Sequence, residues 1–191
     1  SGLTWFGKTG KTDALLSVIM RKRGNIYQSD GEHAPNKEKP AALFAKGSVG
    51  ITDSNKAGAS LRLYRNNTTE PGNSTQTHGD SGLRDRKTVQ NDVQFWYQYA
   101  PVDNSLINVK STLYLSDITI KTNGHNKTAE WRNNRTSGVN VVNRSHTLIF
   151  PGAHQLSYGA EYYRQQQKPE GSATLYPEGN IDFTSLYFQD E

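Results

Sequence analysis

The sequence predicts an all-β protein, a segment of an antiparallel up-and-down transmembrane β-barrel with about nine strands. Three observations predict this fold class. Only 33% of the 191 residues belong to the hydrophobic set and the mean hydropathy is −0.80, which is low for a close-packed α/β domain. The connections between the predicted strands alternate between short and long. Most of the strands divide into an uncharged face and a polar face.

The strands are predicted from runs in which apolar and polar residues alternate, bounded by turn residues. They run over residues 2–8, 14–23, 41–50, 57–65, 88–99, 106–120, 136–149, 154–166 and 180–189. The short connections are 9–13, 51–56, 100–105 and 150–153, and the long ones are 24–40, 66–87, 121–135 and 167–179. In an up-and-down meander, this alternation places all the short turns at one end of the sheet and all the long loops at the other. Outer-membrane barrels have short periplasmic turns and long extracellular loops in this way.

The two faces of six strands support the same fold. The positions predicted to face lipid are Ala14, Leu16, Val18, Met20, Leu43, Ala45, Gly47, Val49, Ala57, Ala59, Leu61, Leu63, Val93, Phe95, Tyr97, Tyr99, Ile107, Val109, Ser111, Leu113, Leu115, Leu156, Tyr158, Ala160 and Tyr162. None of them carries a charge, and a charge at the bilayer midplane costs such a barrel about 2–4 kcal/mol. The strands at 2–8, 136–149 and 180–189 divide less cleanly, so the sequence predicts no register for them.

Composition bears on several function classes. The 22 basic and 18 acidic residues are interspersed, and no basic stripe predicts a nucleic-acid partner. With no cysteine, disulfides, thiol nucleophiles and cysteine-ligated metals are excluded. No Ser/His/Asp spacing or carboxylate pair supports an enzyme. A chain that opens on Ser1 and stops at "YFQDE" is expected to be a piece of a longer protein.

The stretch "GLTWFGKT" at residues 2–9 matches the phosphate-binding pattern in which two glycines are followed by Lys-Thr. Only Ser1 precedes Gly2, so no buried strand leads into the pattern, and its variable positions include bulky Trp5 and Phe6. We therefore interpret residues 7–13 as the end of a strand and a tight turn.

Several stretches resemble the barrel of TonB-dependent outer-membrane receptors, in particular the branch that takes up haem from haemoglobin or a haemophore. "ALLSVIMRKRGNIYQSDG" and "HQLSYGAEYYRQQQ" resemble strands that open into extracellular loops, "LYFQDE" resembles the entry to a later strand, and "YQYAPVDNSLINVKSTLYLSD" is similar to a periplasmic hairpin. The resemblance implies a 22-stranded barrel with a plugged lumen. Residues 1–191 would then be a partial barrel, with the plug domain and the remaining strands elsewhere.

The resemblance also implies a function and a location. The chain would be part of a receptor in the bacterial outer membrane that binds and imports haem or another iron-containing ligand. The partners would be haem, a haemoprotein or a haemophore at the extracellular loops, outer-membrane lipid, and TonB through parts missing from this chain. Haem would be a transported ligand, and no intrinsic cofactor is implied. The motif Tyr99-Ala100-Pro101 lacks the arginine of the family's haem-site motif, so no haem or metal ligand is assigned.

Candidate ligand-binding residues are those of the predicted extracellular loops whose side chains are common binding anchors or haem ligands. They are Tyr27, His33, His78, Arg84, Arg86, His125, Trp131 and Tyr176. Two other function classes stay open: a secreted β-rich adhesin or carbohydrate-binding module, and a P-loop NTPase. A secreted module has no need for an uncharged stripe on successive strands, and an NTPase would have helices.

Overall fold

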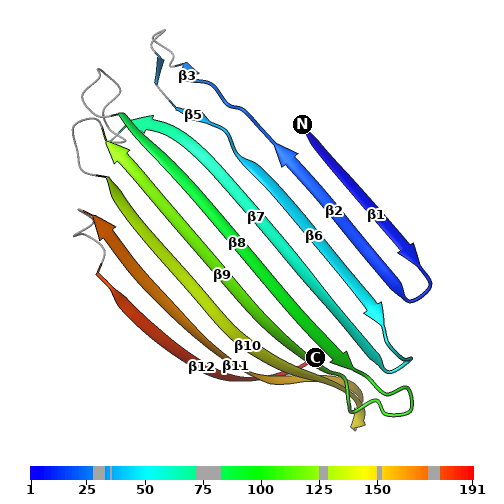
Figure 1. Cartoon of the computed structure of the whole chain (residues 1–191). Helices are drawn as coiled ribbons and strands as arrows, with labels where there is room; N and C mark the ends of the chain where they lie inside the picture. The colour runs from blue at the N-terminus through cyan, green and yellow to red at the C-terminus, as the bar shows by residue number, and fades with distance from the viewer. Residues whose placement is uncertain (28–32, 35, 72–82, 125–128, 150–151, 172–176) are drawn as a thin grey trace.

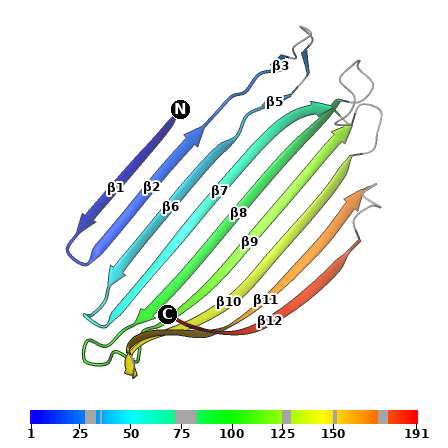
Figure 2. The ribbon, with the colours of Figure 1, turned by 180° about the vertical axis from the view of Figure 1, so that it is seen from behind.

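The computed structural model describes residues 1–27, 33–34, 36–71, 83–124, 129–149, 152–171 and 177–191. These residues form one curved antiparallel sheet and a small separate hairpin (Figures 1 and 2). The long strands are β1 (Gly2–Thr9), β2 (Thr12–Met20), β6 (Ala41–Gly50), β7 (Asn55–Pro71), β8 (Leu83–Tyr99), β9 (Val109–Gly124), β10 (Glu130–Ile149), β11 (Gly152–Gly171) and β12 (Gly179–Asp190). Within the described part of the chain, no helix is long and apolar enough to cross a membrane.

The long strands pair in chain order, each with the next one along, as expected for an up-and-down barrel segment. The predicted connection 24–40 contains three short strands: β3 (Ile26–Tyr27), β4 (His33–Ala34) and β5 (Lys37–Glu38). The strands β3 and β4 form the separate hairpin, and β5 adds to the edge of β7, which makes the main sheet ten-stranded. The all-β, antiparallel prediction is confirmed.

The predicted strand ends were wrong at several places. The strand β7 runs to Pro71 and β8 begins at Leu83, while β9 runs to Gly124 and β10 begins at Glu130. Residues 66–71, 83–87, 121–124 and 130–135 of the predicted loops are therefore strand. By contrast, the connection between β8 and β9 covers 100–108, longer than the predicted 100–105, and Ile107 lies in it. The lengths of these strands were underestimated because their outer parts are polar on both faces. Such segments lack the alternation of apolar and polar residues from which the strands were predicted.

The register places the uncharged positions together on one face. One row of directly paired residues crosses six strands at Ala14, Gly47, Ala59, Phe95, Leu113 and Val139. The next row contains Leu16, Ala45, Leu61, Val93 and Leu115. Large apolar side chains on this face are exposed, including Leu113 at 58% and Phe95 at 57%. We call this surface the convex face and its uncharged central part the apolar belt.

Polar side chains bond to one another across the opposite, concave face. Asp92 accepts hydrogen bonds from Arg62 Nε at 2.5 Å and from Ser116 Oγ at 2.6 Å. The hydroxyl of Tyr114 donates to Glu161 at 2.9 Å. A sheet with one apolar and one hydrogen-bonded polar face is the pattern of a wall between lipid and a wet interior.

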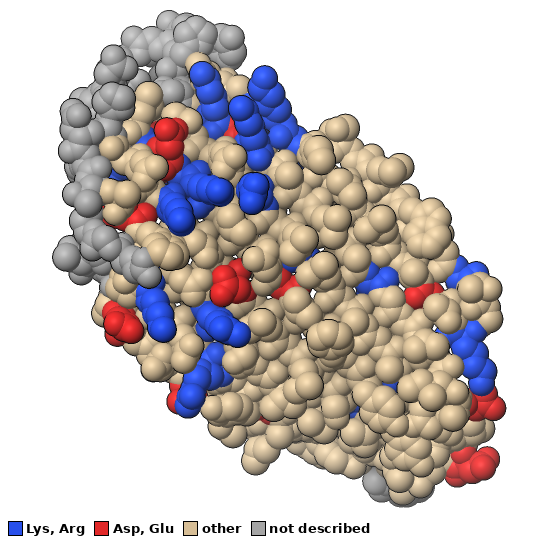
Figure 3. Space-filling model, in the orientation of Figure 1, with Lys and Arg blue, Asp and Glu red and all other residues tan. Residues whose placement is uncertain are grey.

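The charges on the convex face lie mainly outside the apolar belt. Figure 3 shows Lys and Arg side chains gathered toward the end of the sheet where β7 leads to β8, and a broad tan area beyond them with few charges. On β8 the convex positions from Tyr99 to Val89 carry no charge. At about 3.3 Å per residue and a tilt of about 40°, this stretch spans roughly 25 Å, the height of the apolar band of outer-membrane barrels.

The opening phosphate-binding match is a β-hairpin, as predicted for residues 7–13. Thr9 pairs with Thr12, and Gly10 between them has a φ of 52°. This left-handed conformation is typical of the two-residue turns that join antiparallel strands.

Changing Gly10 to alanine is expected to lower the free energy of unfolding by about 1 kcal/mol, because a Cβ disfavours positive φ. No heavy atom lies within 4 Å of the added Cβ, so crowding does not contribute. Gly10→Asn should lose less, since asparagine tolerates this conformation. Urea unfolding of the full-length protein in lipid vesicles would measure both. Equal stabilities of all three proteins would show that the turn does not need glycine.

Candidate ligand-binding site

The candidate site lies on the concave face, at the end of the sheet where β7 leads to β8 and β9 leads to β10. A small pocket of about 50 Å³ is formed there by neighbouring strands. Its lining residues are Arg84, Arg86, Ile120, Thr122, Glu130, Trp131 and Arg132. The register explains why they meet: Arg86 pairs with Thr122, which pairs with Glu130, and Ile120 pairs with Arg132.

The pocket is rich in guanidinium groups and half-buried. Arg86 donates from its terminal nitrogen to Glu70 Oε1 at 2.7 Å, an ion pair along the same face. The Nε of Arg86 is buried and has no acceptor among the described residues. Arg84 takes part in none of the ion pairs between described residues. The site therefore offers guanidinium donors, which bind carboxylates and phosphates well, in a space that fits such a group rather than a large ring.

Two of the predicted site residues, Arg84 and Arg86, come together in this pocket. Both were expected in a loop but lie on β8, because the strand continues past the apolar belt as a polar ladder paired with β7 and β9. Because the two residues are separated by one position on a strand, both side chains lie on the concave face. A prediction that these residues lie in a loop could not indicate this shared face.

Trp131 was also expected in a loop and lies near the start of β10. It contributes to the pocket lining, but it pairs with Lys121, and both positions belong to the convex face. Lys121 Nζ lies 4.6 Å from the centre of the indole ring, a cation–π contact. The indole Nε1 is buried without an acceptor among the described residues.

The other predicted site residues are less fully described. Tyr27 and His33 are directly paired across the β3–β4 hairpin, so these two candidates lie side by side. His78, His125 and Tyr176 lie outside the described residues. Among the residues that the structure describes, no group of three or more His, Asp or Glu side chains could hold a metal ion.

The residues that sequence reasoning missed here are Glu70, Glu130 and Arg132. Each lies in a predicted loop and was not assigned a role. Glu70 orients Arg86, and Glu130 and Arg132 complete the lining. The spacing of Arg84, Arg86 and of Glu130, Arg132 at alternate positions is the signal that would have placed each pair on one face of a strand.

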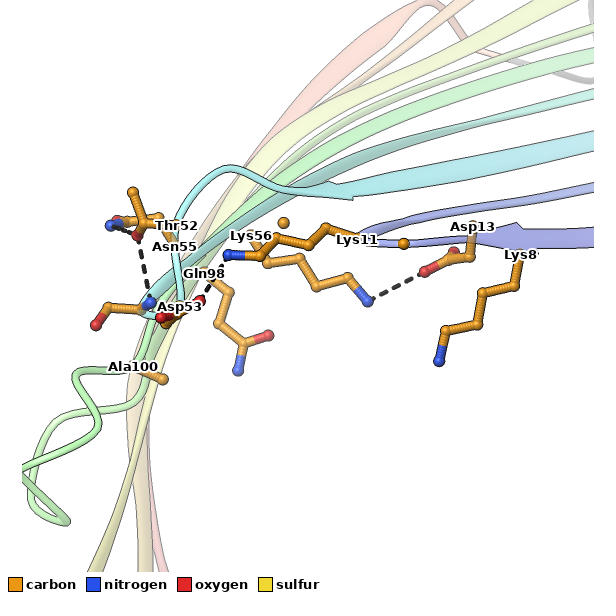
Figure 4. A pocket seen from close by; sticks show the side chains of 12 residues that line it. Lys8, Lys11, Asp13, Thr52, Asp53, Asn55, Lys56, Gln98 and Ala100 are labelled. Carbon is orange, nitrogen blue, oxygen red and sulfur yellow. Dashed lines mark hydrogen bonds and ion pairs between the residues drawn. The ribbon is translucent and has the colours of Figure 1, made fainter.

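A larger hollow of about 420 Å³ lies at the opposite end of the sheet, beside the short turns. Figure 4 shows the side chains of Lys8, Asp13 and Lys56 on the concave side of the sheet there. Lys11 bonds to Asp53 at 2.6 Å and Lys56 to Asp13 at 3.2 Å. The hydrogen bond from Lys11, together with its charge, lowers the pKa of the Asp53 carboxyl. These pairs join neighbouring hairpins, so we assign this hollow a structural role.

A third hollow, of about 620 Å³, lies where the 100–108 connection meets β10 and β11. Its lining includes His146 near the end of β10 and His154 near the start of β11. His154 Nδ1 lies 3.0 Å from Asp190 Oδ1 on β12, which joins the neighbouring strands at this end. Nearby, Asn143 Nδ2 and Ser145 Oγ donate to the Leu106 carbonyl at 2.9 and 2.7 Å and fix the connection on the convex face.

Comparison with known proteins gives a consistent picture. No family model matches the chain. Over its whole length it is 37% identical to a hemin receptor of Yersinia pestis and 36% identical to a hemin receptor of Yersinia enterocolitica. The chain spans 29% and 28% of these relatives, which is less than a third of their length.

A solved structure resembles the fold. It is a double mutant of the Serratia marcescens hemophore receptor HasR in complex with its hemophore HasA and heme. The TM-score is 0.81 at 20% sequence identity, over 98% of this chain and 28% of that chain. The curved sheet described above therefore has the same fold as part of that receptor.

Proposed function

We infer that this chain is a segment of the β-barrel of a TonB-dependent outer-membrane receptor that binds and imports haem or another iron-containing ligand. The observation that carries the inference is the similarity of the whole chain to the two hemin receptors. Since the chain spans less than a third of those receptors, the plug domain, the remaining strands and the segment that recruits TonB are assigned to parts outside residues 1–191.

The apolar belt supports a location in the outer membrane. The uncharged convex stretch of β8 is roughly as tall as the lipid-facing band of outer-membrane barrels. The exposed side chains of Phe95 and Leu113 belong to this belt. In this orientation the short connections are periplasmic and the β7–β8 and β9–β10 connections are extracellular. The alternative of a secreted β-rich module gains no support, because such a module would expose this belt to water.

The barrel would act as a receptor wall and not as an enzyme. Its contribution would be to hold the capture site and enclose the path of the ligand, while energy coupling would come from TonB. The concave face, lined with Arg62, Asp92 and Glu161 in hydrogen-bonded contacts, would form part of the wet interior.

We assign ligand capture to the guanidinium pocket at the extracellular end. Haem is a flat apolar ring with two carboxylates, and Arg84, Arg86 and Arg132 offer the donors that such carboxylates prefer. The pocket of about 50 Å³ would hold a carboxylate, with the ring lying outside it. The loop residues Tyr27, His33, His78, His125 and Tyr176, together with Trp131, remain candidates for contact with haem or with a haemoprotein or haemophore that delivers it.

The test is growth of a strain from which the gene for the full-length protein has been deleted. With hemin as the only iron source, growth should be lost on deletion and restored by the full-length gene, while growth on ferric salts should not change. Purified full-length protein should also bind hemin in an absorbance titration. Unchanged growth on hemin combined with no binding would overturn the proposal, and a defect on a different iron chelate would replace haem with that ligand.

A further inference from the structure

The concave face has an apolar corner on β1, β2 and β6. Its large side chains are Phe6, Leu15, Ile19 and Phe44, and we call these four residues the apolar corner. Phe6 pairs directly with Leu15. Phe44 pairs with Ser17, which stands on the same face of β2 between the other two members. Phe6 is 65% exposed and Ile19 43%, so the described part of the chain leaves much of this corner uncovered.

The wall beside the apolar corner is polar, and its side chains bond to one another. Arg62, the partner of Phe44 on β7, donates to Asp92 at 2.5 Å. Inside the corner, the hydroxyls of Thr4 and Ser17 bond to each other at 2.9 Å and so offer little to water. An exposed apolar patch on an otherwise hydrogen-bonded wall is typical of a surface that binds an apolar partner.

Two lysines border the apolar corner on the side of the short turns. Lys46 pairs directly with Leu15. Lys8 follows Phe6 by two positions on β1, which places it on the same face, and Figure 4 shows it on the concave side. Neighbouring strands lie about 4.8 Å apart and successive residues of one face about 6.7 Å apart. The corner therefore covers roughly 10 Å by 13 Å, enough for one face of a flat multi-ring molecule.

The charge at this border is only partly balanced within the protein. Asp13 pairs with Lys8 in the register, but its carboxylate accepts hydrogen bonds from Lys56 Nζ at 3.2 Å and Ser48 Oγ at 2.5 Å. Lys8 and Lys46 are exposed and form no ion pair with another described residue. Three ammonium groups thus share one carboxylate, so the border keeps a net positive charge that attracts anions.

We propose that the apolar corner and its two lysines form a second binding station, on the inner wall of the barrel, for a flat apolar ring that carries carboxylates. The ring packs against Phe6, Leu15 and Phe44, which removes apolar surface from water. Its carboxylates accept charge-assisted hydrogen bonds from Lys8 and Lys46. Haem has this chemistry, so the proposal rests on the proposed function. The station is distinct from the guanidinium pocket on β8 to β10 and lies nearer the short turns, where it receives the ligand after capture.

The experiment is an absorbance titration of hemin into the purified full-length protein in detergent. Two binding steps are expected, one at the capture pocket and one at the station. Lys8→Gln with Lys46→Gln should weaken the station's step about 10-fold, the combined effect of two exposed ion pairs, and leave the capture step unchanged. The matched control is Lys110→Gln with Arg144→Gln. It removes the same charge from the concave face at least three strands away from β6 and should change neither step.

The ring contact is tested separately from the carboxylate contact. Phe44→Ser should weaken the station's step about 10-fold for hemin and for its dimethyl ester alike, whereas the lysine variant should lose affinity for hemin alone. Phe183→Ser removes an aromatic side chain that is 42% exposed on the concave face of β12, and it should leave the station's step unchanged.

A single binding step in the unaltered protein, or a second step that ignores both the lysine and the Phe44 variants, would overturn the station. Urea unfolding of Phe44→Ser identifies the other occupant: a large loss of stability with an unchanged titration would show that another part of the full-length protein covers the apolar corner. Growth on hemin separates this result from the wider function. A protein that supports growth on hemin but binds it in one step keeps the proposed function and loses only the station.

Discussion

Replacing Leu113 with arginine is expected to lower the free energy of unfolding of the full-length protein in lipid by about 2–4 kcal/mol. Leu113 is 58% exposed on the convex face and pairs directly with Phe95 and Val139, in the middle of the apolar belt. A guanidinium at that depth must be transferred from water into hydrocarbon, and the neighbouring side chains offer it no carboxylate. Urea titration of the protein in vesicles, followed by tryptophan fluorescence, would measure the loss.

Two variants isolate the charge as the cause. Leu113→Ala removes the same apolar side chain without adding a charge and should lose much less. Gln94→Arg places an arginine on the concave face, where Gln94 is exposed and pairs with Tyr114, so its stability should change by under about 1 kcal/mol. A small loss for Leu113→Arg, or a loss matched by Gln94→Arg, would mean that lipid does not face the convex side.

Replacing both Arg84 and Arg86 with glutamine is expected to weaken hemin binding by the full-length protein about 100-fold. Each arginine can make charge-assisted hydrogen bonds worth roughly 1.5–3 kcal/mol to a carboxylate, and the Nε of Arg86 has no acceptor among the described residues. The pair acts on one pocket, so the two effects should not be fully additive. An absorbance titration with hemin would give the affinity of each variant.

The ligand itself supplies the sharpest control. The dimethyl ester of hemin keeps the ring and the iron but has no free carboxylates, so its affinity should be nearly the same for the unaltered and double-variant proteins. Arg144→Gln removes an exposed arginine near the short-turn end of β10 and should not change hemin binding. If the double variant bound hemin normally, or lost hemin and the dimethyl ester equally, the carboxylate role of Arg84 and Arg86 would be rejected.

The sequence predicted the fold where apolar and polar residues alternate. Phe95 and Leu113 were placed on the lipid-facing side from their own strands alone, and the register brings them into contact as a direct pair. Outside the apolar belt both faces are polar, so hydropathy no longer distinguishes strand from loop. The strands β7 to β10 continue there because their backbone groups pair with neighbouring strands, which is information from other parts of the chain.

The candidate site was predicted as a set of residue types and not as a geometry. Arg84 and Arg86 were both selected as candidates in a predicted loop, but the ion pair of Arg86 with Glu70 depends on the pairing of β7 with β8. The face on which Trp131 lies could have been predicted from the sequence. It has the same parity as Val139 on one uninterrupted strand, so its convex position follows from counting in twos once β10 is known to be continuous.

The pairing of each long strand with the next one along the chain has a consequence for how the molecule assembles. A strand joins the sheet through a partner that has just been made, so each closure spans a single connection and costs little chain entropy. The hairpin of β1 and β2 can form first, and each later strand then finds a complete edge to pair with. Growth by one hairpin at a time also limits the exposed edges to two strands at every stage, β1 and the strand added last, which reduces the opportunity for pairing with other chains.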